Sequence, residues 1–468
     1  MLKRMILFIG LWGGLAGTSA VYAAASNFIS ISDIHFNPFL SCQTAPCPLI
    51  KNLSAAPASQ WQAVFIREGQ YRFSHYQEDT DYALLQSALS SLQASAAHVH
   101  PRFVLILGDF LGHNYQAMYQ RYSGDQSAQG YGDFVDKTII FLSRELQAAF
   151  PGVPIYPVIG NNDSASGDYS EIPSGEFYRA TAAAWSPLLD APNRSAFHKT
   201  FPYAGYYSVT VPGETRHRII VLNTVLFSPY AHSASDAELN TAAETELNWL
   251  QSQLEQAVAL REQVWIIAHI PVGVDAYKTY KLSFLWLSRK NYWQLKYQER
   301  FLQLIAAYQS EIKAELLGHM HMDAMALIKY HGHTIGYISV TPSISPIFGN
   351  NAAYKIYQYD PSDFAPLDYS TYYLDLATPA KTGMWQKEYE FNAIYPQSGG
   401  SDLQTNIVKL LNGAQLKTAP LMDSYIQYYT VGHKNAQPIW QHFMPYYWCA
   451  MSTTTNIDYQ VCYDTTHE

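Results

Sequence analysis

Five short apolar segments along the chain share one feature at their carboxyl ends. Each stops just before a polar residue of a type that binds metal ions, or before a glycine that precedes one. The segments are 28–32, 103–107, 155–159, 264–268 and 314–317. Short runs rich in Ile, Val and Leu, bounded by glycine or proline, are typical of buried β-strands. We therefore predict five buried strands with polar residues at their ends.

The stretches between these strands carry apolar residues three or four positions apart, which is the spacing of one face of an α-helix. The clearest series is Leu247, Leu250, Leu254 and Val258. Upstream of it, Ser235 and Glu238 have the spacing of a capping box. Residues 301–308, 81–97 and 134–150 are also predicted to be helical. Alternating strands and helices indicate a layered α/β architecture.

A second group of strand-like segments predicts another sheet packed against the first. It comprises residues 206–211, 218–222, 325–330 and 334–340. Beyond residue 360 the sequence is rich in tyrosine and shows no clear period. We expect residues 361–468 to form a C-terminal extension that packs on a catalytic domain of residues 26–360.

The first 25 residues have the pattern of an export signal. Lys3 and Arg4 precede an apolar run, and small residues close the segment at Ala25. We interpret residues 1–25 as a signal peptide, which makes the mature protein periplasmic or secreted. A membrane anchor is the alternative, and it is disfavoured because glycine, serine and threonine dilute the apolar run.

Composition and charge narrow the class of protein. The chain has 468 residues, of which 48% are hydrophobic and 14% charged, so it can bury a large core and is not disordered. Its 29 basic and 38 acidic residues give a formal charge of −9. Removal of Lys3 and Arg4 with the signal leaves 27 basic residues and a charge of −11. This balance argues against a nucleic-acid scaffold.

The four cysteines are compatible with export to an oxidising compartment. They allow three connectivities, and proximity in the sequence favours Cys42–Cys47 and Cys449–Cys462. Four free thiols are the alternative, and they are less common in an exported protein. We therefore predict two disulfide bonds.

The polar residues at the predicted strand ends form a candidate metal-binding set. They are Asp33, His35, Asp109, Asn161, His269, His319 and His321. Ligand sites in open α/β sheets form beyond the carboxyl ends of strands, where loops converge. Asp33 and His35 are two residues apart, and in extended backbone both side chains would project to the same side.

The chemistry of this set suggests which metal ions it would bind. Four imidazoles, two carboxylates and an amide oxygen suit zinc, manganese or iron better than calcium or magnesium, with zinc the first choice. Seven ligands are too many for one tetrahedral ion and about right for two ions that share a carboxylate. We therefore expect two divalent metal ions as cofactors.

Five blocks of residues resemble the calcineurin-like metallophosphoesterases. In order, they are Asp33-Ile-His35, Gly108-Asp109, Gly160-Asn161-Asn162-Asp163, His269 within Ala-His-Ile-Pro, and Gly318-His319-Met-His321. Further stretches resemble the acid sphingomyelinase and sphingomyelinase-like phosphodiesterase branch of that superfamily: 206–208, 341–346, 350–360, and His113 four residues beyond Asp109. The likeness spans roughly residues 28–360.

The resemblance implies a four-layer α-β-β-α sandwich and a dinuclear centre. One ion would be held by Asp33, His35, Asp109 and His321. The other would be held by Asp109, Asn161, His269 and His319, so that Asp109 bridges the two. The family chemistry is the attack of a metal-bridging hydroxide on phosphorus, opposite the leaving alkoxide.

One position departs from the family pattern. The family has a histidine directly after the metal-binding asparagine, and this chain has Asn162 there. An amide donates a hydrogen bond to a phosphoryl oxygen but does not deliver a proton. His113 then remains as the candidate general acid, with a satisfied loop histidine as the alternative reading. We predict catalytic roles for His113 and Asn162.

Other polar residues are given structural roles. His331 and His333 alternate along a probable strand and are expected on its exposed face. His98, His100 and His198 are expected at the surface. Asp163 and Asp323 are expected to be partners of ligands or structural residues, not ligands themselves. Phe284–Leu287 is either a loop that contacts substrate or a peripheral lipid surface, or a buried helix face.

These observations predict an exported phosphodiesterase that hydrolyses a small phosphoester. The sphingomyelinase proper carries a saposin domain, and no such segment fits between Ala25 and Asp33. We therefore expect a nucleotide or another soluble phosphodiester in preference to membrane sphingomyelin. Two alternatives stay open: a phosphomonoesterase or nucleotidase with the same centre, and a catalytically weakened protein that binds a phosphorylated ligand.

Overall fold

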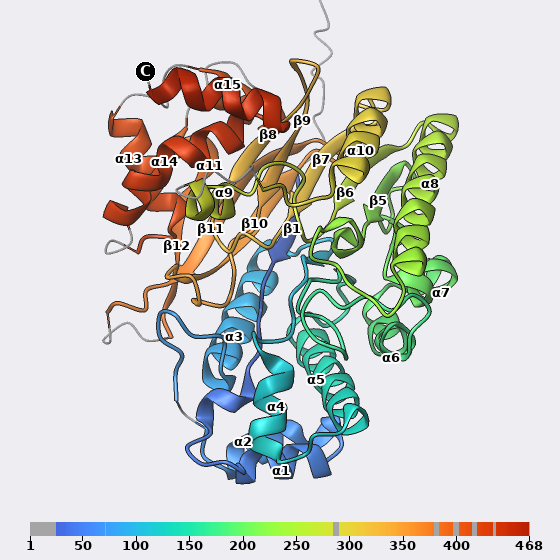
Figure 1. The fold of residues 1–468 in the computed structure, drawn as a ribbon, viewed down its shortest axis with the longest axis vertical. Helices are drawn as coiled ribbons and strands as arrows, with labels where there is room; N and C mark the ends of the chain where they lie inside the picture. Colours follow the sequence, from blue (N-terminus) through green and yellow to red (C-terminus); the bar gives the residue numbers. More distant parts are fainter. Residues whose placement is uncertain are drawn as a thin grey trace, which may run out of the picture.

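Two six-stranded sheets form the centre of the molecule (Figure 1). The computed structural model describes residues 25–70, 72–283, 290–378, 383–395, 402–413, 419–433 and 437–467. The strand order is β12-β11-β10-β1-β2-β3 in the first sheet and β4-β5-β6-β7-β9-β8 in the second.

The first sheet joins the beginning of the described chain to its later part. Its strands are β1 (Ser26–Ile31), β2 (Val104–Ile106), β3 (Ile155–Pro157), β10 (Ala352–Tyr359), β11 (Pro366–Leu374) and β12 (Trp385–Glu390). β1, β2 and β3 are parallel, while β10 pairs antiparallel with β1 on its other side. The parallel strands therefore direct their carboxyl ends to one edge.

The second sheet contains the remaining six strands. They are β4 (Tyr207–Thr210), β5 (His217–Val221), β6 (Gln263–Ile267), β7 (Ile312–Leu317), β8 (Met325–Tyr330) and β9 (His333–Val340). β5, β6, β7 and β9 run parallel, and β4 and β8 are antiparallel edge strands.

The predicted division of the strands between the two sheets is wrong. The five strands that precede candidate ligands were expected in one sheet, but β6 and β7 belong to the second sheet with β4, β5, β8 and β9. The helix α8 (Asp236–Leu260) connects β5 to β6 as a parallel crossover, so β6 lies beside β5 and not beside β3.

The two sheets pack face to face through aromatic side chains. The ring of Phe28 in β1 lies 4.8 Å from that of Trp265 in β6, and Phe103 also contacts Trp265. Across the same interface, the hydroxyls of Ser339 in β9 and Tyr357 in β10 are 2.8 Å apart. All five side chains are buried, so the main core lies between the sheets.

Helices cover the outer faces and complete the four-layer α-β-β-α sandwich that was predicted. Ser91 and Ser95 of α3 (Tyr82–Val99) hydrogen-bond Tyr354 of β10, which fixes α3 on the first sheet beside α5 (Ala128–Ala149). α8 and α10 (Leu295–Ala307) pack on the second sheet. Ser235 accepts a hydrogen bond from the Glu238 N–H, so it caps α8 as expected.

The remaining helices lie around this frame. Before residue 290 they are η1 (Pro38–Ser41), α1 (Pro48–Ala55), η2 (Ala58–Gln60), α2 (Trp61–Arg67), α4 (Tyr115–Ser123), α6 (Glu176–Trp185), η3 (Ser186–Leu188), α7 (Ala191–Ala204), η4 (Thr224–Phe227) and α9 (Ala276–Ser283). After residue 390 they are α11 (Phe391–Ile394), α12 (Leu403–Asn412), α13 (Ala419–Tyr429), α14 (Gln437–Ser452) and α15 (Asn456–His467).

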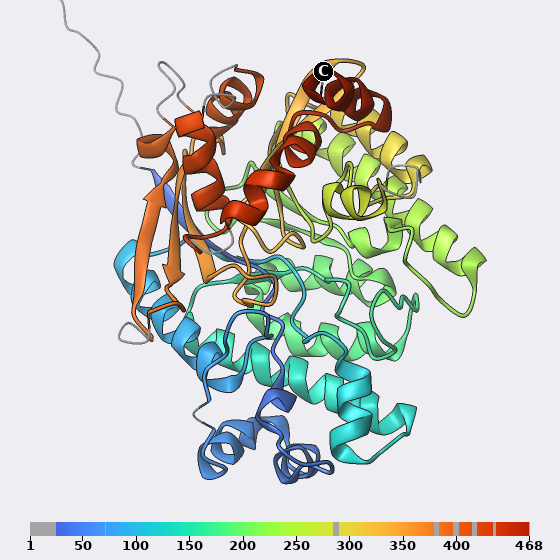
Figure 2. The same ribbon diagram turned by 60° about the vertical axis from the view of Figure 1, so that its left-hand side comes forward.

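The chain after residue 360 adds both strands and helices to the body. β11 and β12 extend the first sheet beyond β10, and α12 and α14 contact β8 of the second sheet. Figure 2 shows these C-terminal helices in red, gathered at one end of the molecule. This part of the chain therefore contacts both sheets.

Both predicted disulfide bonds are present. Cys42 pairs with Cys47 and Cys449 with Cys462, which joins α14 to α15. The predicted signal peptide, except for its last residue, lies outside the described residues, as does Phe284–Leu287. Within the described ranges, no helix has both the length and the apolar character needed to span a bilayer.

Candidate metal centre

Loops after five strands bring the seven candidate ligands together at the junction of the two sheets. Asp33 and His35 follow β1, Asp109 follows β2 and Asn161 follows β3. From the second sheet, His269 follows β6, while His319 and His321 follow β7. All seven are buried except His319, which is partly exposed. The candidate ligands converge although the strands were assigned to the wrong sheet. The reason is that the carboxyl ends of β1, β2, β3, β6 and β7 meet at this junction.

The backbone at most of these residues adopts an uncommon conformation. Asp33, His35, Asp109, His319 and His321 have φ values of +49°, +43°, +56°, +69° and +62°. The extended backbone expected around Asp33 and His35 is therefore wrong. Left-handed conformations of residues other than glycine are sterically unfavourable and cluster at functional sites. Five of seven candidate ligands in this region of φ indicate a local geometry that serves the site.

One group of donor atoms surrounds the first candidate ion position. The Nε2 atoms of His35 and His321 lie 3.1 Å apart. His35 Nε2 is 3.3 Å from Asp109 Oδ2, and His321 Nε2 is 3.3 Å from Asp33 Oδ1. These four residues are the set that the family resemblance assigns to one ion.

A second group meets the first at Asp109. His269 Nε2 lies 3.2 Å from Asp109 Oδ2 and 3.2 Å from Asn161 Oδ1. The ligand atoms of Asp109, His269 and His319 all lie within 4.8 Å of one another. Asp109 thus belongs to both groups, as a bridging carboxylate would.

The hydrogen bonds of two imidazoles show that the site fits cations. His35 Nδ1 is 2.9 Å from the Leu111 carbonyl, and His269 Nδ1 is 2.6 Å from that of Leu107. A carbonyl only accepts, so each Nδ1 donates, and in the neutral form of the ring, the form that binds a metal ion, the lone pair is on Nε2. These lone pairs face carboxylates and another imidazole, so acceptor faces acceptor. Two divalent cations among these atoms would satisfy all of them.

The charges in the cluster favour added positive charge. Burial disfavours a charged imidazole, but the Asp109 and Asp33 carboxylates outweigh it and raise the pKa of His35 to about 10. In the same way, burial opposes and Asp109 favours protonation of His269, whose pKa rises to about 9. Burial and the neighbouring imidazoles lower the pKa of His319 and His321 well below the usual value. The centre therefore attracts cations but does not hold four imidazolium ions.

Residues around the ligands fix their positions. Asp163 accepts hydrogen bonds from the backbone N–H groups of Phe110, Leu111 and Gly160, which ties the loop after β2 to the loop after β3. Gly160 is required because a Cβ atom there would lie 2.2 Å from Asp109 N and Oδ1.

Asp163 and Asp323 take the supporting roles expected for them. Asp163 holds backbone groups at the site. Asp323 lies in the core and pairs with Lys355 at 2.7 Å and with the Thr371 hydroxyl at 2.6 Å. Neither carboxylate belongs to the groups of potential metal ligands found among the described residues.

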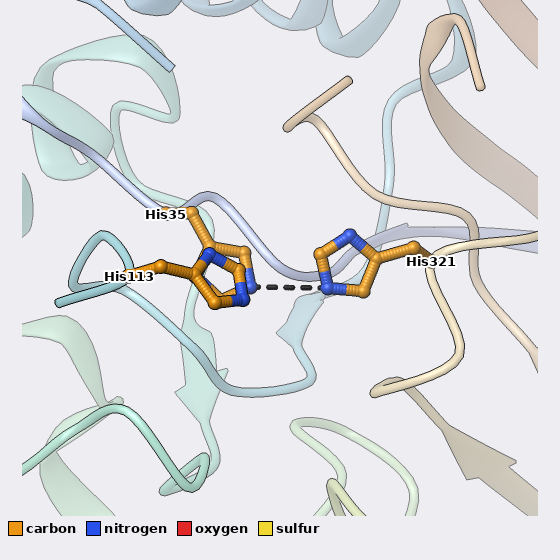
Figure 3. A group of neighbouring side chains, drawn as sticks. All are labelled: His35, His113 and His321. Atoms are coloured by element: carbon orange, nitrogen blue, oxygen red, sulfur yellow. Dashed lines mark hydrogen bonds between the residues drawn. The ribbon is translucent and has the colours of Figure 1, made fainter. Parts of the chain in front are cut away.

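Both predicted catalytic residues lie beside the cluster. The His113 ring stacks on that of His35 with centroids 4.2 Å apart, opposite His321 (Figure 3). Asn162 Nδ2 donates to Asp109 Oδ2 at 2.9 Å, and the Asn162 backbone N–H donates to Asp109 Oδ1 at 2.8 Å. Asn162 therefore holds both oxygens of Asp109 in place.

A cavity of about 790 Å³ opens over the cluster. Its wall includes aromatic residues from distant parts of the chain: Tyr169, Tyr292, Phe348, Tyr429, His433 and Tyr447. His433 stacks on Tyr76 with centroids 3.8 Å apart and hydrogen-bonds the Gly349 carbonyl. Sequence reasoning missed this contribution of the C-terminal region, because its many tyrosines carried no periodic signal.

Five histidines outside the site are exposed. His98, His100, His198, His331 and His333 all lie at the surface, as expected. Sequence reasoning missed one further acidic residue, Asp79, whose carboxylate contacts His113. Its position before α3 gave no motif from which this contact could be inferred.

The fold and site define an α/β protein whose two facing sheets carry a buried histidine and carboxylate centre suited to two cations. No protein-family model matches the chain. It is 29% identical to the cyclic GMP-AMP phosphodiesterase SMPDL3A of Rattus norvegicus, over 70% of this chain and 72% of that protein. It is 24% identical to the acid sphingomyelinase-like phosphodiesterase 3b of Mus musculus, over 86% and 82% of the two chains.

The chain is also similar to another curated protein and to a solved structure. The sphingomyelinase phosphodiesterase D of Dictyostelium discoideum is 26% identical, over 78% of this chain and 81% of that protein. Among solved structures, a dimetal phosphatase from Danio rerio has a TM-score of 0.40 at 11% identity, and covers 74% of this chain and 95% of its own. The resemblance to sphingomyelinase-like phosphodiesterases found from the sequence motifs is confirmed by the curated relatives.

Proposed function

We propose that the protein is an exported phosphodiesterase with a dinuclear metal centre, within the class of metal-dependent phosphoester hydrolases. The observation that carries the proposal is the convergence of seven metal-type donors, from loops after five strands, at the base of one large cavity. The names of the curated relatives, all phosphodiesterases, support the class.

The residues around the two candidate positions indicate how the ions would be held. Asp33, His35, Asp109 and His321 would hold one ion, and Asp109, Asn161, His269 and His319 the other. Zinc is the first choice for this mixed nitrogen and oxygen set, with manganese and iron as alternatives. When bound, two such cations would activate a water molecule and neutralise charge on the phosphoryl oxygens.

The protein's own side chains would orient the substrate and move one proton. Asn162 would hold Asp109 in its bridging orientation through the two hydrogen bonds described above. His113 lies at the edge of the cluster and lines the cavity, so its Nε2 atom is available to the leaving oxygen. We assign to it the transfer of a proton to that oxygen as the ester bond breaks.

The cavity supports a diester substrate. Its volume of about 790 Å³ exceeds what one phosphate group needs, and its wall of tyrosine and phenylalanine side chains offers packing for organic groups on the phosphate. We propose a nucleotide or another soluble phosphodiester over membrane sphingomyelin. Export is supported by the two disulfide bonds, which form in oxidising compartments.

One panel of substrates tests the proposal. The purified protein is loaded with zinc, manganese or iron in separate samples and assayed with bis(p-nitrophenyl) phosphate, p-nitrophenyl phosphate, dinucleotides and sphingomyelin vesicles. We expect two ions per chain and a preference for the soluble diesters. Preference for the monoester would favour a phosphomonoesterase. Binding of phosphate by metal-loaded protein without hydrolysis of any ester would refute the enzyme.

A further inference from the structure

Asp79 forms a close pair with His113 at the edge of the candidate centre. The Asp79 Oδ1 atom lies 2.8 Å from His113 Nδ1. The other carboxylate oxygen, Oδ2, accepts a hydrogen bond of 2.8 Å from the backbone N–H of His113 itself. One carboxylate therefore holds both the main chain and the ring of the same histidine.

The carboxylate is itself fixed by its surroundings. Its side chain is only 4% exposed, against 30% for His113. Asn37 Nδ2 donates to Asp79 Oδ2 at 2.9 Å, and backbone hydrogen bonds join Asn37 and His35 to Thr80. Gly112 permits this close packing, since a Cβ atom there would lie 2.8 Å from Asn37 Cβ and 3.0 Å from Asp79 Oδ2.

This arrangement determines which ring nitrogen of His113 is free. A carboxylate only accepts hydrogen bonds, so Nδ1 of the His113 ring must carry a proton. Nε2 is then the atom left for a substrate. The ring stacks on that of His35 (Figure 3). It also makes an edge-to-face contact with Phe348, with centroids 5.9 Å apart, so packing restricts its rotation as well.

We propose that Asp79 is a positioning residue that holds His113 in the Nδ1–H tautomer, with Nε2 directed to the leaving group of the substrate. The catalytic part of this inference rests on the proposed function. In that reaction His113 starts as the imidazolium ion, with a proton on each ring nitrogen. The oxygen of a water molecule bonds to phosphorus as the P–O bond to the leaving group breaks, the leaving oxygen takes the proton from Nε2 of His113, and the ring is left neutral with Nδ1–H still bonded to Asp79.

The isosteric variant Asp79→Asn tests this because its geometry forces a different tautomer. Two N–H donors, from His113 and Asn37, converge on the Oδ2 position, so the amide oxygen of the variant must occupy that position. The amide NH₂ then replaces Oδ1 opposite Nδ1, which must become an acceptor. The ring would change to the Nε2–H tautomer without a change of shape. A neutral ring that gives up its Nε2 proton is left as an imidazolate anion, so it is a much poorer proton donor than the imidazolium ion that Asp79 supports.

The first readout is spectroscopic and needs no activity. Protein labelled with ¹⁵N-histidine is studied without metal at alkaline pH, and the His113 signals are identified by their loss in His113→Gln. We expect the Nδ1–H tautomer in the unmodified protein and the Nε2–H tautomer in Asp79→Asn. An Nε2–H tautomer in the unmodified protein overturns the proposal, even if the variant does not fold.

The second readout is the rate with matched leaving groups. Asp79→Asn should lower kcat by about 10²-fold or more for alkyl esters, with little change in KM and a much smaller loss for aryl esters. In a His113→Ala background the substitution should have no further effect. Asp81→Asn is the control: it changes a buried carboxylate that caps α3 two residues away, and should leave both rates unchanged.

The two readouts separate the possible failures. If the tautomer changes as expected but no phosphoester is hydrolysed, the proposed function fails and the positioning contact stands. If esters are hydrolysed but Asp79→Asn reduces the rate equally with and without His113, Asp79 does not act through His113 and the inference is wrong.

Discussion

Replacement of Asp109 by asparagine is the sharpest test of the dinuclear centre. The carboxylate oxygens of Asp109 lie within 3.3 Å of both His35 Nε2 and His269 Nε2, where the two groups of donors meet. Asp109→Asn keeps the size and one oxygen but removes a charge. In addition, the amide NH₂ of the variant would replace one of the two oxygens that accept hydrogen bonds from Asn162, so one donor would face another donor.

The size of the effect follows from the distance. One unit of positive charge at the distance of His35 Nε2, which is 3.3 Å from Asp109 Oδ2, would be stabilised by about 5 kcal/mol at an effective dielectric constant of about 20. Water that hydrates the ion in place of the carboxylate, together with the remaining amide oxygen, would offset part of this loss of stabilisation. A loss of about 3 to 4 kcal/mol per ion corresponds to metal binding weaker by about 10²- to 10³-fold.

Metal content and activity measure this directly. We expect two ions per chain in the unmodified protein, one or none in Asp109→Asn after dialysis, and loss of nearly all diesterase activity. Asp81→Asn, which changes a buried carboxylate outside the cluster, should retain two ions. Two tightly held ions and full activity in Asp109→Asn would refute the reasoning that this carboxylate bridges the centre.

Three further predictions concern the supporting structure. Gly160→Ala should destabilise the fold by about 3 kcal/mol and weaken metal binding, whereas Gly132→Ala, where a Cβ meets nothing within 4 Å, should leave thermal unfolding unchanged or raise its midpoint. Burial raises the pKa of Glu171 to about 8, so the folded state keeps a proton that the unfolded chain releases above about 4.5. Stability should therefore fall as the pH rises through this window, by about 1.4 kcal/mol per unit, and denaturation of Glu171→Gln should lack that part of the slope. Removal of the Cys449–Cys462 bond, which closes a loop with a separation of 13 residues, should cost about 3 kcal/mol in denaturant unfolding; no change would show that the loop is already ordered in the unfolded chain.

The order of elements could be predicted from local patterns. A buried strand is marked by a short apolar run, and an amphipathic helix by apolar residues three or four positions apart. The segments before Asp33, Asp109, Asn161 and His269 are strands as expected, and the cap at Ser235 forms. Membership of a sheet could not be predicted in the same way. It depends on which neighbour a strand meets after a crossover, and nothing within β6 or β7 encodes that partner.

Only part of the candidate site could be predicted from the sequence. Residues that follow strand ends were found because their chemistry and position coincide in the sequence. Asp79 and His433 were missed because each reaches the site through a loop, and a loop contact depends on the packing of other elements. The left-handed backbone at His35 and His321 was also missed, because this conformation is uncommon for any residue other than glycine and no local pattern marks it.

The distribution of donors along the chain has a consequence for how the active protein arises. No single loop supplies more than two of the seven donors, and the loops that carry them extend from residue 33 to residue 321, so the chain must be folded through residue 321 before both candidate ion positions exist. A newly made chain should therefore acquire its metal late, after both sheets have closed on each other. Bound metal would then be a stringent marker of correctly matured protein, and the ion taken up would reflect the compartment in which maturation ends.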